Sequence, residues 1–168
     1  VCVTQLADTV RVGAGRDQTR LAELAAAIGD PARVATIAVD LTLDDAPQRI
    51  VDLAVDRWGH IDFLINNAGV GSPKPLHETD DETLDYFLGL MLRAPFRLAR
   101  HVLPHMRPGS AIINVTSIEA HRAGPGFAIY SAMKAAHVNL TKSLALELGP
   151  KLVRVNCEAV VILTRAFV

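Results

Sequence analysis

Apolar residues along this chain follow two alternating patterns, one typical of buried strands and the other of amphipathic helices. Short and nearly continuous apolar runs predict strands at Thr9–Gly13, Arg33–Val39, Ile61–Ile65, Ala111–Val115 and Leu152–Asn156. Between them, apolar residues spaced three and four apart predict helices at Gln18–Ile28, Asp44–Trp58, about Thr79–Leu103 and Phe127–Leu148. The segment Val1–Asp8 fits either a strand or the last turns of a helix, and Ala159–Leu163 is a further apolar run.

This alternation of strands and helices defines a fold class. It predicts right-handed β-α-β units and therefore an α/β fold with a three-layer, doubly wound parallel sheet of the Rossmann-like kind. The chain of 168 residues is long enough for one core, so we expect a single domain that spans residues 1–168. Gly13 and Gly15 form a G-x-G pattern, but position 18 is Gln18 rather than a third glycine. We interpret the pair as a strand end and not as a phosphate-binding loop.

Composition narrows the possible partners. Apolar residues make up 50% of the chain and the net charge is −1, which indicates a globular domain and argues against nucleic acid as a partner. No apolar stretch approaches the about 20 residues that a membrane span needs. Cys2 and Cys157 match no disulfide or zinc pattern, so we expect small apolar filler and a cytoplasmic location.

Two histidines have the spacing of metal ligands. His101 and His105 are four residues apart, as two ligands on one helix face would be. Pro104 between them and the lack of a nearby acidic residue favour a solvated helix end instead. We therefore expect no metal site.

A tyrosine and a lysine on the last predicted helix are candidates for proton transfer. Tyr130 and Lys134 are four residues apart and share one helix face, and Ser117 follows the strand Ala111–Val115. An ammonium beside a phenol favours the phenolate and lowers a tyrosine pKa from about 10. A serine hydroxyl can hold a substrate oxygen next to that phenol. A surface lysine beside a half-buried tyrosine would give the same local pattern. The motifs elsewhere in the chain therefore have to distinguish a proton-transfer site from an ordinary surface pair.

Polar residues follow three of the predicted strands. Asp40, Asn67 and Ser117 each come directly after, or two residues after, an apolar run. In open α/β sheets, ligands bind outside the carboxyl ends of the strands. We therefore expect these three side chains at the ligand-binding edge.

The motifs Asn66-Asn67-Ala68-Gly69, Ser117 and Tyr130-Ser131-Ala132-Met133-Lys134 resemble, in order and spacing, those of the short-chain dehydrogenase/reductase family. The resemblance runs from about Thr9 to Asn156. It implies an oxidoreductase that transfers a hydride between NAD(P)(H) and a small-molecule secondary alcohol or ketone. By resemblance, Tyr130 is the general acid/base and Ser117 steadies the carbonyl oxygen. Lys134 lowers the tyrosine pKa and holds the hydroxyls of the nicotinamide ribose.

The resemblance also implies a cofactor site. Its residues would be Arg16, Asp40, Leu41, Asn67, Ala68, Gly69, Tyr130 and Lys134. Gly15 stands where the family's NAD-selecting acid would lie, and the arginine after it favours NADP over NAD. Asp17, one residue later, keeps NAD open. A plain turn at Asn67–Gly69 and an ordinary helix-leading aspartate at position 40 are the alternatives.

Parts of the family pattern are missing. The first strand with its T-G-x-x-x-G-x-G loop does not occur, and Val160-Val161 replaces the proline-glycine after the last strand. We interpret the chain as part of a longer protein, with weakened cofactor affinity and a sheet that lacks its central strand. A short natural variant is the alternative.

The third predicted helix starts with Thr79 and Glu82 at capping-box spacing and carries a further departure. Met91 stands where many family members have a catalytic asparagine, whose carbonyl is thought to hold a relay water. Pro95 has no N–H to donate to the carbonyl of Met91. The hypothesis is that this carbonyl holds the water by itself; a carbonyl bonded within a regular helix would contradict it.

Two other functions are compatible with parts of the sequence. A non-catalytic remnant of the same fold would explain the missing loop and Met91. A sugar epimerase or dehydratase of the related extended branch also uses Tyr-x-x-x-Lys, but the Asn66–Gly69 motif and the short chain argue against it.

Apolar residues surround most of the helix Phe127–Leu148, so we expect a homodimer or homotetramer.

Overall fold

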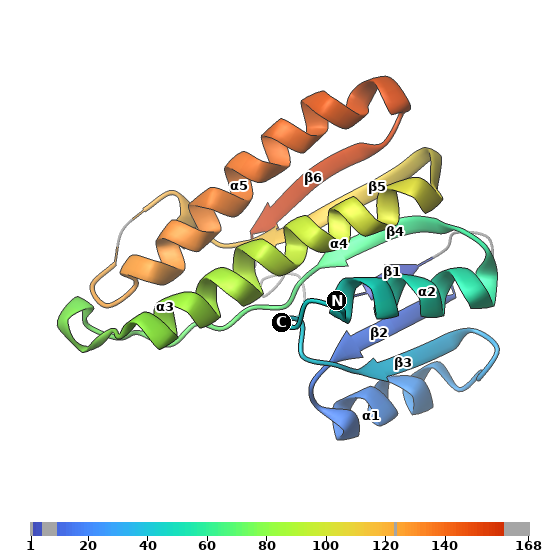
Figure 1. Cartoon of the computed structure of the whole chain (residues 1–168), viewed down its shortest axis with the longest axis horizontal. Coiled ribbons are helices and arrows are strands. Elements are labelled where there is room, and N and C mark those ends of the chain that lie inside the picture. The colour runs from blue at the N-terminus through green and yellow to red at the C-terminus, as the bar shows by residue number, and fades with distance from the viewer. Residues whose placement is uncertain (1, 5–9, 123, 160–168) are drawn as a thin grey trace.

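The computed structural model describes residues 2–4, 10–122 and 124–159. Its six-stranded sheet has the order β3-β2-β1-β4-β5-β6 (Figure 1). The strands are β1 (Cys2–Thr4), β2 (Arg11–Gly15), β3 (Val34–Ala38), β4 (Ile61–Asn66), β5 (Met106–Thr116) and β6 (Arg154–Ala159). The helices are α1 (Gln18–Ile28), α2 (Ala46–Trp58), α3 (Asp81–Leu88), α4 (Ala94–Val102) and α5 (Ala128–Leu148).

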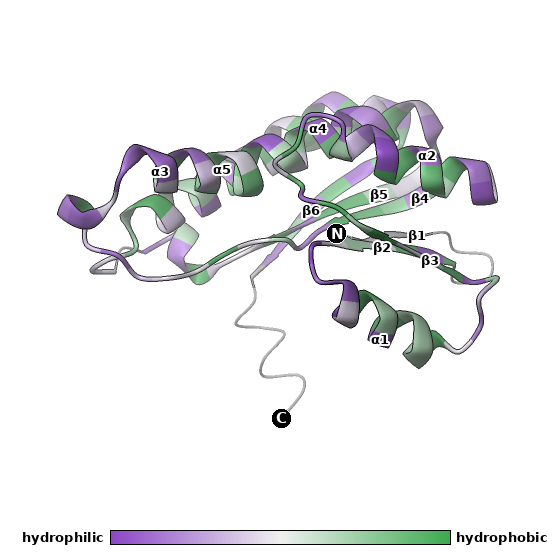
Figure 2. Cartoon of the chain, turned by 60° about the horizontal axis from the view of Figure 1, so that its bottom comes forward, coloured by the Kyte–Doolittle hydropathy of each residue, from purple (hydrophilic) through white to green (hydrophobic). Residues whose placement is uncertain are grey.

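Helices cover both faces of this sheet. Figure 2 shows α1 on one face and α2, α4 and α5 on the other. The neighbours β2 and β3 run parallel, as do β4, β5 and β6. The three-layer, Rossmann-like α/β prediction is therefore confirmed. Gly13 and Gly15 both lie within β2, in agreement with their interpretation as a strand end.

The centre of the sheet differs from the prediction. Instead of a missing strand, β1 lies between β2 and β4 and runs antiparallel to both. The inner edges of β2 and β4 offer main-chain N–H and C=O groups that a neighbouring segment can pair with. Only six residues separate β1 from β2, and a parallel connection needs a dozen or more. The short link therefore imposes the antiparallel direction. The other residues of Val1–Asp8, and positions 160–163, lie outside the described residues.

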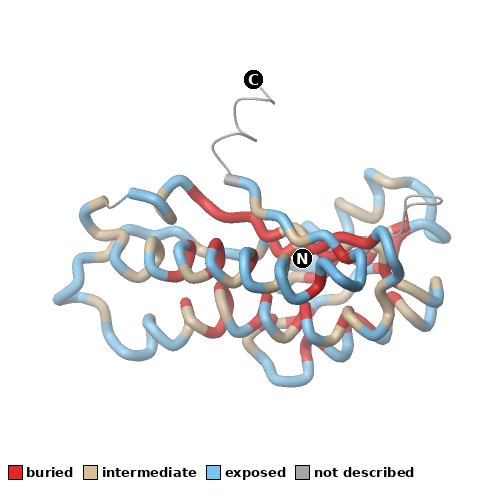
Figure 3. The backbone as a smooth tube through the Cα atoms, turned by 90° about the horizontal axis from the view of Figure 1, so that it is seen from above, coloured by how far each residue is buried: buried red, intermediate tan, exposed pale blue. Residues whose placement is uncertain are grey.

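The core lies between the sheet and the helices on its α2/α4/α5 face. Ile50 of α2, Leu64 of β4, Leu98 of α4 and Ile112 of β5 have no exposed surface. Burying a side chain of this size contributes about 1.5–3 kcal/mol. Buried residues, red in Figure 3, gather on the strands and on the helix sides turned toward them. This packing fixes the strand ends that carry the candidate site.

The helix predicted from Thr79 to Leu103 begins two residues later than expected. Asp80 is the N-cap of α3 and accepts the Thr83 N–H at 2.8 Å, so the predicted capping box at Thr79 is wrong. The Thr79 hydroxyl instead donates to the carbonyl of Pro75 at 3.0 Å, across a short 3₁₀ turn at Leu76–Glu78. An aspartate and a threonine are both good caps, and this preceding turn decides between them.

The same helix is interrupted at its middle. A π-helical turn, Gly89–Arg93, separates α3 from α4, and the Ala94 N–H donates to the carbonyl of Gly89. Pro95 follows at the start of α4, where its missing N–H removes the α-helical bond to Met91. The carbonyl of Met91 thus lies in a π turn and not in a regular α-helix. The observation that would have contradicted the relay-water hypothesis, a Met91 carbonyl bonded within a regular helix, is therefore not made.

The described residues contain neither a membrane-spanning helix nor a cluster of metal-binding side chains. None of their helices combines the length and the hydropathy needed to cross a bilayer. They also contain no group of three or more His, Cys, Asp or Glu side chains placed to hold a metal ion.

Candidate active site

The candidate site lies at the carboxyl ends of the parallel strands. Asp40 follows β3, Asn67 follows β4 and Ser117 follows β5, as the sequence predicted. β4 and β5 are in register up to Asn66 and Asn114, so the two segments that follow leave the sheet side by side. The helix α5 then returns across β5 and β6 and brings Tyr130 and Lys134 toward the same edge.

Lys134 is a buried cation at this edge. Its side chain is 4% exposed, and its Nζ donates to the carbonyl oxygen of Val115 at 2.8 Å. The Nζ also lies 5.8 Å from the centre of the Tyr130 ring. Burial lowers the pKa of Lys134 from its ordinary value because the charged form loses its hydration. The tyrosine and the lysine therefore do share one face, and the lysine is anchored to the strand that ends at the serine.

Packing fixes the ring of Tyr130. Phe127 meets it edge-to-face with the ring centres 5.9 Å apart. On another side lies Gly71, where a Cβ would stand 3.4 Å from the ring carbon Cε2. The phenol is thus held between the segment after β4 and the start of α5.

Ser117 starts a short 3₁₀ turn, Ile118–Ala120, that packs against α5. The serine is 8% exposed, and its Oγ accepts the Glu119 N–H at 3.3 Å. Because it stands two residues after Val115, it belongs to the same strand end that receives the Lys134 ammonium. The structure therefore brings Tyr130 and Lys134 together and anchors the lysine to the strand end that leads into Ser117, whose own hydroxyl contacts Glu119.

A buried polar network beneath this set was missed by the sequence analysis. Asn66 Nδ2 donates to Asn114 Oδ1 at 2.9 Å, and Asn114 Nδ2 donates to Thr141 Oγ1 at 2.8 Å. The hydroxyl of Thr141 in turn donates to the carbonyl of His137 at 2.8 Å. The network joins β4, β5 and α5 two turns below Lys134. An asparagine within the apolar run of β5 was the available signal, because buried polar groups need partners.

His137 is a second buried group that the sequence analysis missed. It is 2% exposed, and neither of its ring nitrogens has a hydrogen-bond partner among the described residues. Burial, together with the positive charge of Lys134 one turn away, lowers the pKa of His137 to about 4. The imidazole is therefore neutral at physiological pH.

A cavity of about 170 Å³ lies beyond the ends of β2, β3 and β4. Its lining consists of Ala14, Gly15, Arg16, Val39, Asp40, Leu41, Ala68, Gly69, Val70 and Leu90. Five of these are predicted cofactor-binding residues, whereas Asn67 is exposed and does not line the cavity. A Cβ at Gly69 would lie 3.6 Å from Lys134 Nζ, so this glycine borders the lysine directly.

Arg16 and Asp40 face each other in this cavity. Arg16 Nη1 lies 3.9 Å from Asp40 Oδ2, and the guanidinium lies 5.6 Å from the centre of the Tyr86 ring. The other carboxylate oxygen of Asp40 accepts the N–H and the hydroxyl of Thr42. These two bonds, with a smaller contribution from Arg16, hold the pKa of Asp40 below its ordinary value. The carboxylate therefore stays ionised and shapes the turn after β3.

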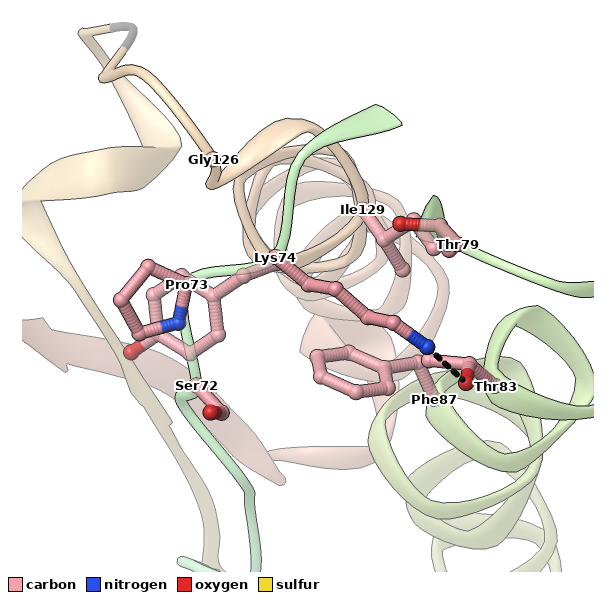
Figure 4. Close-up of a pocket in the computed structure, with 9 residues that line it drawn as sticks. Ser72, Pro73, Lys74, Thr79, Thr83, Phe87, Gly126 and Ile129 are labelled. Carbon is pink, nitrogen blue, oxygen red and sulfur yellow. Dashed lines mark hydrogen bonds between the residues drawn. The ribbon is translucent and has the colours of Figure 1, made fainter. Parts of the chain in front are cut away.

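A second cavity, of about 120 Å³, lies on the Tyr130 side (Figure 4). Its lining consists of Ser72, Pro73, Lys74, Thr79, Thr83, Phe87, Gly126, Ile129 and Tyr130. Tyr130 lines this second cavity, whereas Ser117 and Lys134 line neither of the two; Lys134 is next to the first cavity only through Gly69.

The sheet order and the position of the set at the carboxyl edge define the Rossmann-like α/β class. Within that class, the chain belongs to the short-chain dehydrogenase/reductase family. A family model described as "Enoyl-(Acyl carrier protein) reductase" matches residues 4–166. A solved structure with this fold is a short-chain dehydrogenase/reductase from Brucella melitensis titled "Glucose/ribitol dehydrogenase". It has a TM-score of 0.83 and 36% identity and covers 87% of this chain and 59% of that one.

Curated relatives agree with this family. A "Glucose and ribitol dehydrogenase" from Daucus carota is 41% identical over 121 residues, and an "NADPH-dependent aldehyde reductase 1, chloroplastic" from Arabidopsis thaliana is 40% identical over 121 residues. Each match covers 71% of this chain but only 42% of the relative. The chain thus spans less than half the length of these two relatives.

Proposed function

We propose that the protein is an NAD(P)-dependent oxidoreductase that interconverts a secondary alcohol and a ketone. The observation that carries this proposal is the buried ammonium of Lys134 beside Tyr130, between two cavities at the carboxyl edge of the sheet. A buried cation is costly unless its hydrogens have partners. Among the described residues, the ammonium donates one of its three hydrogens to the carbonyl of Val115, and we assign the other two to a ligand.

The residues of the first cavity fit a dinucleotide. The backbone at Ala68 and Gly69 can approach a ligand closely because no Cβ stands between Gly69 and the lysine. A bound nicotinamide supplies or accepts the hydride. In the proposed roles, Lys134 donates its remaining hydrogens to the nicotinamide ribose, and Asp40 with Leu41 lies beside the adenine.

In the proposed proton transfer, Tyr130, Ser117 and Lys134 each have a different role. In carbonyl reduction, the Tyr130 hydroxyl gives its proton to the substrate oxygen, and in alcohol oxidation the phenolate takes it back. Ser117 donates a hydrogen bond to the same oxygen and holds it in line. The charge of Lys134 favours the phenolate that remains after proton donation.

We propose NADP(H) rather than NAD(H) as the preferred cofactor. Arg16 lines the cavity, and its guanidinium is the kind of group that binds a 2′-phosphate. Asp17, the alternative that would suit NAD, is engaged elsewhere. It is the N-cap of α1, where its Oδ1 accepts the Arg20 N–H at 3.1 Å. One of the curated relatives is also named as NADPH-dependent.

The Met91 hypothesis stays part of this proposal. Pro95 deprives the Met91 carbonyl of its α-helical donor, and Met91 itself is 1% exposed. We infer that this carbonyl holds a water that transfers protons to Lys134.

We also propose a homo-oligomer formed through α4 and α5. The exposed apolar residues Phe96 of α4 and Leu146 of α5 support it, with exposed fractions of 49% and 82%.

The direct test is cofactor binding and turnover by the full-length protein. NADPH fluorescence should rise on binding, and Tyr130→Phe should still bind NADPH while its turnover falls at least a hundredfold. A non-catalytic remnant, the alternative, would bind neither NADPH nor NADH. Wild-type protein that binds neither cofactor would therefore contradict the proposal.

A further inference from the structure

Arg16 lies between a carboxylate and an aromatic ring beside the first cavity. Its Nη1 is 3.9 Å from Asp40 Oδ2, and its guanidinium carbon is 5.6 Å from the centre of the Tyr86 ring. The first distance exceeds that of a hydrogen bond, so Asp40 balances part of the charge without binding a particular N–H group. The second distance is within the about 6 Å over which a cation and a ring attract each other. The arginine thus has two neighbours that hold it in different ways.

The Tyr86 ring has a fixed position of its own. It is partly buried and packs against the hydrophobic core from the last turn of α3. Leu90, in the turn that follows, lines the first cavity, so Tyr86 lies next to the proposed cofactor site. Gly89 lies against the turn after β3, where an added Cβ would be 3.5 Å from Thr42 Cγ2. Thr42 donates its N–H and its hydroxyl to Asp40, so this contact places the ring and the carboxylate relative to each other.

The two neighbours affect the binding of an anion differently. A carboxylate competes with a phosphate for the N–H groups of the guanidinium, because both are acceptors in its plane. An aromatic ring attracts the guanidinium through its face, so it leaves those N–H groups available. A guanidinium that is already held also loses less conformational entropy when a ligand binds. Tyr86 is therefore the neighbour that favours phosphate binding.

We propose that Tyr86 is a positioning residue for cofactor selection: its ring holds the Arg16 guanidinium in place for the 2′-phosphate and so increases the preference for NADPH over NADH. The inference rests on the proposed function, which assigns this phosphate to Arg16. Tyr86 itself touches no phosphate in this role, and its hydroxyl group is not needed. The face of the ring carries the effect, so phenylalanine should replace the tyrosine and an aliphatic side chain should not.

Two nucleotides that differ by one phosphate test this role. Adenosine 2′,5′-bisphosphate and adenosine 5′-monophosphate differ only at the 2′ position, and neither can take part in hydride transfer. Their dissociation constants can be measured on the full-length protein by isothermal titration calorimetry, with no need for turnover. We expect the wild-type protein to bind the bisphosphate about tenfold more tightly. Tyr86→Leu should reduce this preference to about threefold, and Tyr86→Phe should keep it.

A double variant shows whether the ring acts through the arginine. Arg16→Gln should reduce the preference to about twofold, and the addition of Tyr86→Leu should not reduce it further. Leu84→Ala, at an exposed position of α3, is the control and should leave the preference at about tenfold. If Tyr86→Leu fails to fold, Tyr86→Met keeps a long apolar side chain without a ring and takes its place under the same criteria.

Four results would overturn the proposal. They are a wild-type protein without the preference, an unchanged preference in Tyr86→Leu, an equal loss in Tyr86→Phe, and a further loss in the double variant. The result can also be separated from that of the proposed function. Selective binding of the bisphosphate through Tyr86 and Arg16 without hydride transfer would contradict only the oxidoreductase proposal. Turnover with NADPH, together with the same preference in wild type and Tyr86→Leu, would contradict only the role of Tyr86.

Discussion

The Lys134 ammonium donates to the carbonyl of Val115 at 2.8 Å and lies 5.8 Å from the ring centre of Tyr130. The cation is thus anchored to the strand that leads into Ser117, and its position does not depend on the tyrosine side chain. Loss of the phenol should leave the lysine in place, whereas loss of the lysine should affect cofactor and proton transfer together.

The first prediction concerns this lysine. Lys134→Met should lower kcat/KM at least a hundredfold and weaken NADPH binding, because the buried donor to the ribose is lost. Lys142→Met, which removes an exposed lysine from the same helix, is the control and should change neither quantity. Steady-state kinetics and NADPH fluorescence provide the measurements. Unchanged cofactor affinity in Lys134→Met would contradict the proposed ribose contact.

A second prediction concerns the cofactor phosphate. Arg16→Gln should weaken NADPH binding about tenfold and change NADH binding by less than twofold, because only NADPH carries the ribose 2′-phosphate that we assign to this guanidinium. Arg20→Gln, an exposed arginine that pairs with Asp17, should alter neither affinity. Equal losses for both cofactors in Arg16→Gln would assign the arginine to packing on Tyr86 and not to phosphate recognition.

The buried network predicts a stability effect. Asn114→Ala leaves Asn66 Nδ2 without its acceptor and removes the donor to Thr141 Oγ1, whose own bond to His137 remains, and should lower the free energy of unfolding by about 1–3 kcal/mol. Asn139→Ala, at an exposed position of α5, should change it by less than about 0.5 kcal/mol. Urea unfolding measures both. A neutral Asn114→Ala would show that the network adds nothing to stability.

His137 predicts a pH dependence of stability. Its pKa is about 4 in the folded protein and close to 6.5 in the unfolded chain, so between these values only the unfolded state takes up the proton. Stability should therefore fall as the pH drops from about 6.5 to 4, by up to about 3 kcal/mol, and this contribution should change little below pH 4. Urea midpoints measured across this range for wild type and His137→Leu should diverge at low pH. Parallel curves for the two proteins would show that His137 does not cause the pH dependence of stability.

Gly126 predicts a local effect of backbone geometry. Gly126→Ala places a side chain at φ +79° and 3.2 Å from Pro73 Cβ, so it should cost about 1–2 kcal/mol and weaken ligand binding beside Tyr130. Gly15→Ala is the matched control. Gly15 lies in β2 without a positive φ and no atom lies within 4 Å of the added Cβ, so stability should be unchanged or slightly higher. Equal effects of the two substitutions would contradict the role given to the loop contact.

The sequence predicted most of the fold because its patterns are local. The helix Gln18–Ile28 was predicted with its exact observed bounds, since the apolar spacing and Gly29 at its end both lie within the segment. The last strand begins at Arg154 and not at Leu152, because Leu152 adopts φ 57° in the turn after α5. The direction and place of β1 could not be predicted, because they depend on edges that only the assembled sheet offers.

The candidate site was predictable where the residue types themselves carry the chemistry. Ser117, Tyr130 and Lys134 stand out by spacing, and Asp40 by its place after a strand. The sequence did not single out Asn114, Thr141 and His137, because their importance comes from burial and from partners on other elements. Lys74 was equally invisible in the sequence, since its partners Thr83 and Gly126 come together only through the loops after β4 and β5.

The Lys74 N–H donates to the carbonyl of Gly126 at 2.9 Å, and this bond between two residues that line the second cavity has a practical consequence. Because prolines occupy both neighbouring positions, Lys74 carries the single amide hydrogen of this three-residue segment. Its rate of deuterium uptake therefore reports how often the two loops part. A ligand seated beside Tyr130 should slow that uptake, so one resonance can follow the opening and closing of the cavity.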